Sequence, residues 1–358
     1  MRVCEQILEL ARWAPSGDNT QPWRFEIKGE HEVVIHGFDT RDHCVYDLDG
    51  HPSQMALGAL LETTRVAATG HGLCADVTRR LDLADETPTF DVRFVADAAI
   101  QPSPLIPFIT TRAVQRRPMS AKALTPEQKS LLETSIAPQY EIVWFETLGE
   151  RWKIAKIMFN NAKLRLTMRE AYEMHRSVIE WNVRFSEDKI PDQAVGLDPM
   201  TAKLMHWVMQ SWPRVEFFNT WLAGTIMPRV QLDLIPGLAC AAHFGLAAKA
   251  VPQSIDDYVA AGRAMQRFWL EAARLGLWVQ PEMTPVIFSR YNREQRQFTS
   301  NASARELGIR LASDFTAFLG EAWATRLVFF GRSGTGPAPV ARSTRMPLSS
   351  LVLVPKTK

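Results

Sequence analysis

The sequence carries almost no excess of charge of either sign. Its 358 residues include 41 basic and 39 acidic side chains, a formal net charge of +2. Nucleic-acid-binding proteins usually carry a basic surface that displaces the counterions of the phosphates. The composition therefore argues against a nucleic-acid partner, while the 46% hydrophobic content is that of an ordinary folded protein.

Cysteine is scarce and dispersed. No CxxC pair and no zinc-type spacing occurs, which is typical of a protein from a reducing compartment that does not depend on disulfides. The four residues are Cys4, Cys44, Cys74 and Cys240.

Long hydrophobic runs are also missing. The most apolar stretch, residues 234–251, contains His243 and Lys249 and is interrupted by Pro236 and Gly237. We interpret it as a buried strand, because it is marginal in length for crossing a bilayer. The N-terminus has an amphipathic helical pattern and no basic leader. These features predict a cytoplasmic protein with no membrane partner.

The sequence lacks the common catalytic and metal-binding motifs. It contains no HExxH, no paired His/Cys set and no GxSxG elbow. His175, His206 and His243 lie in separate apolar segments, where core or surface histidines are the expected interpretation. We therefore predict no metal site and no catalytic side chain of the nucleophile-triad type.

A repeat divides the chain. A helix ending in Ala-Pro and followed by a strand is expected over 7–27 and again over 131–146, and two long apolar helices, 56–73 and 264–277, both end in Gly-Leu. The pattern predicts an α+β protein of two related halves, residues 1–105 and 106–358, joined near a proline-rich stretch at 102–107.

The second half contains an additional block, about 150–234, with long helical periodicity. It is rich in Trp and Met. Apolar stripes at helical spacing usually only pack in a core. The alternative interpretation is a lid whose aromatic face covers a ligand pocket.

Polar residues 15–23 (PSGDNTQPW) lie between the first helix and the first strand. Gly, Asp and Asn are common in turns for local reasons, so an ordinary turn is one interpretation. The second copy of the repeat has no such loop. This asymmetry favours a ligand-binding role.

Two basic segments are candidates for anion binding. Three arginines occur within residues 112–117, and Arg342 and Arg345 lie near the C-terminus. Arginine forks suit phosphate and other planar anions, although a solvated charge cluster remains the alternative. The glycine-containing run 331–336 lacks the ending of a nucleotide P-loop, but it offers a further Arg and Ser for the same anion.

These motifs resemble the nitroreductase-like flavoprotein superfamily. ARWAPSGDNTQPWRFEI is similar to its signature loop, the helices 56–73 and 264–277 to its dimer-core helix, and 110–128 and 341–352 to its arginine segment and C-terminal tail. The order of the segments resembles the Acg-like branch, in which one chain folds as a pseudo-dimer. The resemblance implies a nitroreductase-like fold and a monomer as its simplest state. It leaves out much of the 150–234 block, which would be a helical lid-like insertion into that fold.

The resemblance also implies one FMN between the two halves. The polar loop would contact the isoalloxazine ring, Arg112 and Arg116 would lie near the ring and the phosphate, and the tail would hold the phosphate. The flavin N5 would carry the chemistry, and the candidate cofactor-binding residues are Pro15, Ser16, Gly17, Asn19, Gln21, Arg112, Arg116, Arg342, Ser343 and Arg345.

The leading hypothesis is an FMN-dependent NAD(P)H oxidoreductase. A hydride would pass through flavin N5 to a small planar acceptor, nitroaromatic or quinone-like. The alternative is a non-catalytic flavin-binding or sequestering protein whose flavin is covered by the helical block. A third hypothesis is an accessory module beside a ThiF-type adenylylating domain.

Overall fold

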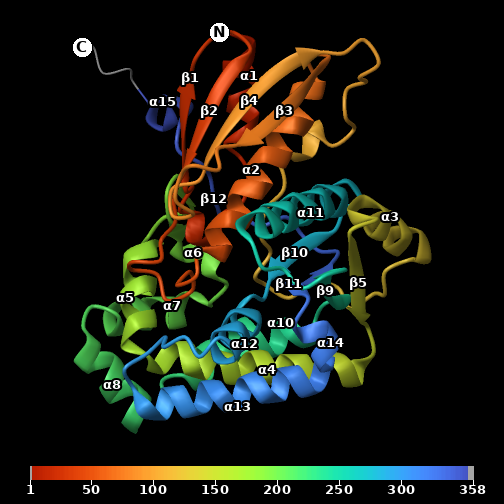
Figure 1. Ribbon diagram of the computed structural model, residues 1–358. Helices are drawn as coiled ribbons and strands as arrows, with labels where there is room; N and C mark the ends of the chain where they lie inside the picture. Colours follow the sequence, from red (N-terminus) through yellow and green to blue (C-terminus); the bar gives the residue numbers. More distant parts are fainter. Residues whose placement is uncertain (1, 354–358) are drawn as a thin grey trace.

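The computed structural model describes residues 2–353, which form two four-stranded antiparallel sheets flanked by helices (Figure 1). This arrangement confirms the predicted α+β class. The first sheet has the order β1-β2-β4-β3 and the second the order β10-β11-β9-β5. Their strands are β1 (Trp23–Ile27), β2 (Glu32–Gly37), β3 (Leu73–Arg79), β4 (Thr89–Ala96), β5 (Tyr140–Phe145), β9 (Ala242–Ala248), β10 (Trp278–Pro281) and β11 (Leu327–Gly334).

The two sheets are built from elements in matching positions. Helices α1 (Val3–Ala11) and α3 (Pro126–Ile136) precede the edge strands β1 and β5. The long helices α2 (His51–Thr69) and α11 (Ile255–Arg274) lead into the opposite edge strands, β3 and β10. After each long helix a glycine adopts a left-handed conformation, with φ of +67° at Gly72 and +71° at Gly276.

Helices α2 and α11 cross through a reciprocal glycine contact. A Cβ atom on Gly58 would lie 2.0 Å from the carbonyl oxygen of Val259, and one on Gly262 would lie 2.0 Å from that of Met55. In both helices the glycine follows the contacted residue by three positions. Each helix thus presents a glycine to a backbone carbonyl oxygen of the other.

The block inserted into the second half is largely helical, as expected. Its first helix begins at a capping box, in which Thr147 and Glu150 bond each other's backbone N–H groups. Figure 1 shows its later helices on one side of the molecule, below the first sheet. Its helices are α4 (Leu148–Thr167), α5 (Arg169–Val178), α6 (Asp192–Val195), α7 (Pro199–Val208), α8 (Trp212–Trp221) and α9 (Ile226–Arg229), with the short strands β6 (Ile179–Glu180), β7 (Phe185–Ser186) and β8 (Ile190–Pro191).

The strand expected over 234–251 is shorter than predicted. A π-helical turn, Val230–Leu234, runs into α10 (Ile235–Leu238), and only β9 is extended. Pro236 follows the π-helical turn within a helical stretch that is continuous from Ile226 to Leu238, and it has no N–H to donate to that helix. The apolar composition of the segment reflects burial of β9 between β11 and β5.

The C-terminal tail returns to the first sheet. After α12 (Thr284–Arg293), α13 (Ala302–Leu319), α14 (Glu321–Ala324) and β11, the chain forms β12 (Arg342–Ser343) and α15 (Leu348–Leu351). Val352 pairs with Phe25 of β1, and Figure 1 shows α15 beside that strand. Leu348 and Leu351 are buried in the core of the first half.

Membrane insertion through a helix has no support in the described part of the chain. Between residues 2 and 353, no helix combines the length and the apolar character needed to cross a bilayer.

Substituting Gly262 by alanine is expected to destabilise the protein. The added methyl group would meet the Met55 carbonyl oxygen and force α2 and α11 apart, and overpacking of this kind costs about 1–3 kcal/mol. Gly149→Ala in α4 is the control, because no atom lies within 4 Å of its Cβ position. Chemical denaturation measures both variants, and equal stability would contradict the close helix crossing.

Candidate cofactor-binding site

A cavity of about 460 Å³ lies where the two halves meet the helical insertion. Its size is within the range of small-molecule sites, about 300–1,000 Å³. The loop after α1, the arginine segment and the C-terminal tail all contribute to it. Except for Gln21, every cofactor-binding candidate from the sequence lines this cavity: Pro15, Ser16, Gly17, Asn19, Arg112, Arg116, Arg342, Ser343 and Arg345.

The polar loop is held in an unusual backbone conformation. Asp18, Asn19 and Gln21 have φ values of 48°, 64° and 48°, a region that residues other than glycine rarely occupy. Ser16 Oγ accepts a hydrogen bond of 2.9 Å from the Gln21 N–H. Strained backbone persists where the surroundings fix it, and it is enriched at ligand sites.

Gln21 fixes this loop from behind the cavity. Its side chain is fully buried, and Nε2 donates to the carbonyl oxygens of Asn19, at 3.1 Å, and Glu187, at 2.8 Å. Its Oε1 accepts from the Met346 N–H at 3.0 Å. Gln21 therefore joins the loop to the insertion and to the C-terminal tail, which are far away in the sequence.

Three arginines from the two predicted basic segments converge on the cavity and form what we call the arginine cluster: Arg112, Arg342 and Arg345. Within residues 2–353 none of them forms an ion pair with a carboxylate; their hydrogen bonds go to backbone carbonyl oxygens, namely those of Trp13, Thr110 and Ala14. The Arg112 guanidinium lies 4.4 Å from the centre of the Trp269 ring, and its buried Nε has no partner.

The arginine cluster is electrostatically costly as it stands. Burial, together with Arg342 and Arg12, lowers the pKa of Arg345 to about 9. Burial, together with Arg345 and Arg342, also lowers the pKa of Arg112 well below its usual value. Buried charges in proteins are normally paired, so the cluster has the chemistry of an anion-binding site.

A second cationic group, Arg116, faces the polar loop. Burial lowers its pKa to about 10, an effect that Asp18 opposes and Arg332 adds to. Burial raises the pKa of Asp18, against the influence of Arg116 and Arg165. Asp18 also lines the cavity but was not among the predicted site residues. Its position inside the polar loop is the feature of the sequence that could have identified it.

A buried ionic chain lies beneath the cavity. His243 donates from Nδ1 to Glu282 Oε2 at 2.7 Å and from Nε2 to the Gly237 carbonyl oxygen at 2.8 Å. Because both partners are acceptors, the ring must be a doubly protonated imidazolium. Glu282 also binds Arg332 Nη1 at 2.7 Å, and Arg332 Nη2 donates to the Arg116 carbonyl oxygen at 2.9 Å.

These buried ionic contacts correct one prediction from the sequence and agree with another. The run 331–336 was expected to offer a further Arg and Ser to the anion. Instead β11 continues through Gly334, Arg332 is paired with Glu282, and the Ser333 hydroxyl donates to the Trp278 carbonyl oxygen. His243 is a satisfied core histidine, as its apolar surroundings indicated.

Side chains of the helical insertion also line the cavity. The apolar ones include Met158, Met205 and Met209. His175 of α5 also lines the cavity, so it is neither a simple core residue nor a surface one; its Nε2 lies 2.9 Å from the Tyr46 hydroxyl. No group of three or more His, Cys, Asp or Glu side chains in residues 2–353 is arranged to hold a metal ion.

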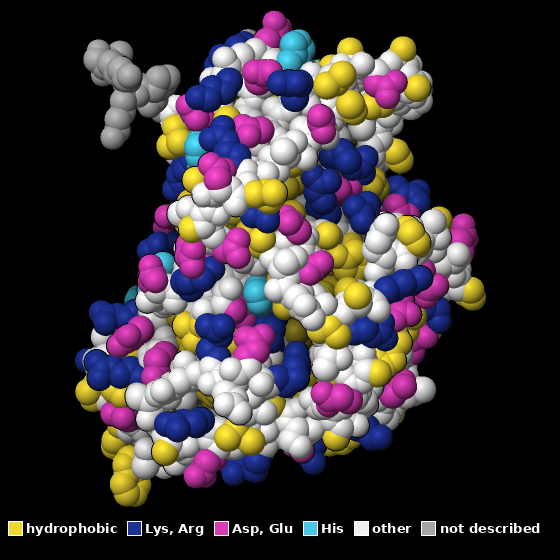
Figure 2. All heavy atoms as spheres, viewed as in Figure 1, with side chains coloured by type: hydrophobic (Ala, Val, Ile, Leu, Met, Phe, Trp, Pro, Cys, Tyr) yellow, Lys and Arg dark blue, Asp and Glu magenta, His cyan; other side chains and the backbone are white. Residues whose placement is uncertain are grey.

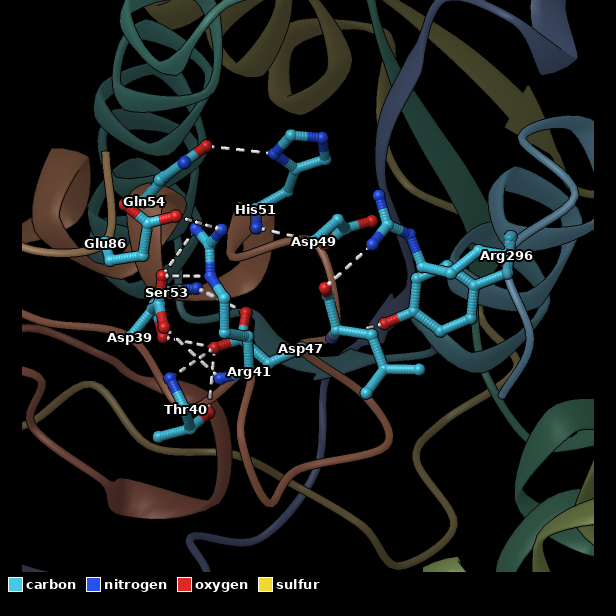
Figure 3. Close-up of polar contacts among 12 residues, drawn as sticks. Asp39, Thr40, Arg41, Asp47, Asp49, His51, Ser53, Gln54, Glu86 and Arg296 are labelled. Carbon is cyan, nitrogen blue, oxygen red and sulfur yellow. Dashed lines mark hydrogen bonds and ion pairs between the residues drawn. The ribbon is translucent and has the colours of Figure 1, made fainter. Parts of the chain in front are cut away.

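The loop between β2 and α2 carries Tyr46 and is fixed by Asp47. Figure 3 shows the hydrogen bonds that converge on this carboxylate. Asp47 Oδ2 accepts from the Thr40 N–H and hydroxyl at 2.9 and 2.8 Å and from the Ser53 hydroxyl at 2.6 Å. Asp49 pairs with Arg290 of α12 at 2.7 Å, so both halves hold the loop.

The outer surface carries charges of both signs. On the face drawn in Figure 2, basic and acidic side chains are interspersed over the two sheets and the insertion. No basic stripe crosses that face.

The chain has weak similarities to known proteins, and no family model matches it. It is 24% identical over 314 residues to the uncharacterized protein MT1398 of Mycobacterium tuberculosis. The aligned region covers 87% of this chain and 42% of that relative. The chain therefore spans less than half the length of this curated relative.

Loose likenesses to solved structures also occur, each covering 71% of this chain at 14% identity. The nitroreductase-like family protein of Bacillus cereus has a TM-score of 0.36 with 97% of that chain covered. The FMN- and NADPH-dependent nitroreductase NfnB from sphigopyxis sp. strain HMH has 0.35 with 100% covered. Iodotyrosine deiodinase bound to FMN and 3-iodo-L-tyrosine has 0.33 with 99% covered.

The buried imidazolium predicts a loss of stability at alkaline pH. Burial lowers the pKa of His243, but Glu282 outweighs this effect and raises it from 6.5 to about 10. The unfolded state releases this proton above pH 6.5, whereas the folded state keeps it up to about pH 10. The contribution of His243 to the free energy of unfolding is therefore complete below pH 6.5 and is lost as the pH rises to about 10. Denaturation from pH 6 to 10 should show a steeper decline for the wild type than for His243→Gln; parallel curves would contradict the assignment.

Proposed function

We propose that this chain is an FMN-binding protein of the nitroreductase-like superfamily, with its cofactor in the cavity between the two halves. The observation that supports the proposal most directly is the arginine cluster. Within residues 2–353, the buried Arg112 and the partly buried Arg342 and Arg345 line one cavity without a carboxylate partner. A bound phosphate monoester would supply the missing negative charge.

The residues of the cavity fit FMN. Arg342 and Arg345, helped by Ser343, would hold the phosphate, and the unpartnered Nε of Arg112 would donate to an oxygen of the cofactor. Pro15, Ser16, Gly17 and Asn19 would contact the isoalloxazine ring, and the buried, unpartnered Oδ1 of Asn19 is an acceptor available to it. Gly17 leaves room for this approach, since its Cβ position has no atom within 4 Å.

Reaction chemistry would come from the cofactor. Bound FMN would accept a hydride from a reduced nicotinamide and deliver it to a small planar acceptor, nitroaromatic or quinone-like. The chain's own contribution would be binding and charge. Arg112, which is buried, and Arg116, which is partly buried, would stabilise negative charge on the ring.

The reciprocal crossing of α2 and α11 supports a single-chain pseudo-dimer. In this interpretation, residues 1–105 and 106–358 take the places of two subunits, and the polar loop occurs in the first half only. The tail reaches across to β1, where it brings Arg342 and Arg345 to a site formed by both halves. A cytoplasmic monomer would then contain one complete cofactor site.

A second candidate function is flavin sequestration. It is favoured by the insertion, because side chains from α4, α5 and α7 line the cavity. A flavin covered by these side chains would be bound without exchanging hydride with a nicotinamide or an acceptor.

Loss of Arg345 is expected to weaken FMN binding. A charge-assisted hydrogen bond contributes about 1.5–3 kcal/mol, so Arg345→Ala should raise the Kd for FMN by about 10- to 150-fold. Flavin fluorescence quenching measures this constant. The control is Arg80→Ala, because Arg80 pairs with Asp91 in the first half and does not line the cavity; equal affinities in the two variants would remove the phosphate assignment.

Anaerobic titration of the FMN-loaded protein with NADPH and then NADH separates the two functions. Bleaching of the visible flavin bands is the result expected of an oxidoreductase. Bands that persist with both nucleotides but bleach with dithionite would identify a covered flavin and support sequestration.

A further inference from the structure

We propose that Tyr46 and His175 form a recognition site for the oxygen of a neutral, planar acceptor. Tyr46 would donate a hydrogen bond from its hydroxyl to a nitro or carbonyl oxygen, and His175 would orient that hydroxyl. The inference rests on the proposed function and extends it, because it assigns the residues that select the second ligand of the cavity.

The pair lies on the cavity wall and joins two separate parts of the chain. Tyr46 comes from the loop between β2 and α2, and His175 from α5 of the insertion. Both line the cavity, with Tyr46 Oη 2.9 Å from His175 Nε2. Their rings are stacked at a centroid distance of 5.8 Å and an interplanar angle of 27°.

Both side chains are neutral at physiological pH. Burial, assisted by Arg165, lowers the pKa of His175 to about 3. Burial also raises the pKa of Tyr46 above its ordinary value. Together the two side chains therefore carry one ring N–H and one phenolic O–H. The pair has no net charge and cannot neutralise a charged group on a ligand.

One arrangement of these two protons leaves a donor for a ligand. When the His175 Nε2–H donates to Tyr46 Oη, the phenolic proton is free to point into the cavity. In the described chain, each of these two atoms has no other hydrogen-bond partner. An oxygen acceptor would satisfy the free proton, whereas an apolar ligand of the same shape would leave it unpaired.

The surroundings favour a neutral planar ligand. Val178, Met205 and Met209 supply an apolar wall beside the pair. The nearby charges oppose each other, since Arg165 forms an ion pair of 3.4 Å with Asp233 and also faces Asp18. Tyr46 itself is positioned firmly, because its neighbours Asp47 and Leu48 bond Ser53 and Tyr291.

The test compares two ligands of nearly the same shape, 4-nitrotoluene and 4-isopropyltoluene, by calorimetric titration of the oxidised FMN-loaded protein. Wild type is expected to bind the nitro compound more tightly. Tyr46→Phe should reduce this preference by about three- to tenfold, the effect of one neutral hydrogen bond, with the affinity for 4-isopropyltoluene unchanged.

Variants of α5 test the orienting role of His175. His175→Gln retains an N–H donor near the position of Nε2 and should keep most of the preference, whereas His175→Leu should lose it. Ser177→Ala is the matched control, because Ser177 lies on the same helix and bonds only the Met174 carbonyl oxygen. Equal preference in wild type and Tyr46→Phe, or no binding of either ligand, would overturn the proposal.

The same titrations on FMN-free protein separate this inference from the proposed function. A nitro preference that depends on Tyr46 in a chain that does not bind FMN would disprove the cofactor assignment and leave the oxygen site standing. FMN binding without a Tyr46-dependent preference would support the cofactor assignment and disprove the oxygen site.

Discussion

Helices α2 and α11 cross with the carbonyl oxygens of Met55 and Val259 resting against Gly262 and Gly58. This approach places the two sheets on opposite sides of one helical pair. Because both helices also present side chains to the cavity, among them Met55 and Met265, the distance between them sets the shape of the cavity floor. A side chain at either glycine would alter the site as well as the fold.

The arginine cluster in the cavity carries an electrostatic cost that other buried arginines avoid by pairing with a carboxylate. Ion pairs such as Arg290–Asp49 and Arg332–Glu282 give other buried arginines a carboxylate. Arg112, Arg342 and Arg345 have only backbone carbonyl oxygens. Unpaired buried cations reduce stability, so their retention in one place is better explained by a ligand than by folding. Their convergence also requires the tail to return from the second half to β1.

Sequence patterns predicted the parts of this architecture that are local. The polar loop, the capped helices and the Gly-Leu helix ends are each encoded within a few residues. Ser16 and Arg345, which the family resemblance proposed as site residues, both line the cavity. The reciprocal use of Gly58 and Gly262 could not be read from spacing, because glycine inside a helix carries no information about its partner. Likewise, Arg332 shares its residue type with the cluster, and only the register of β11 against β9 directs it to Glu282.

Tyr46 and His175 illustrate the same limit at the functional level. Each is unremarkable in the sequence, and 129 positions separate them. They meet because two separate elements are held in place. Asp47 and Asp49 hold the β2–α2 loop, which carries Tyr46. Helix α5, which carries His175, packs against α4. Since the insertion supplies one member of the pair, it is part of the ligand-binding wall and not only a cover. Under the proposed function, the degree to which the insertion admits a second ligand would decide between hydride transfer and sequestration, because both would use the same arginine cluster to hold the cofactor.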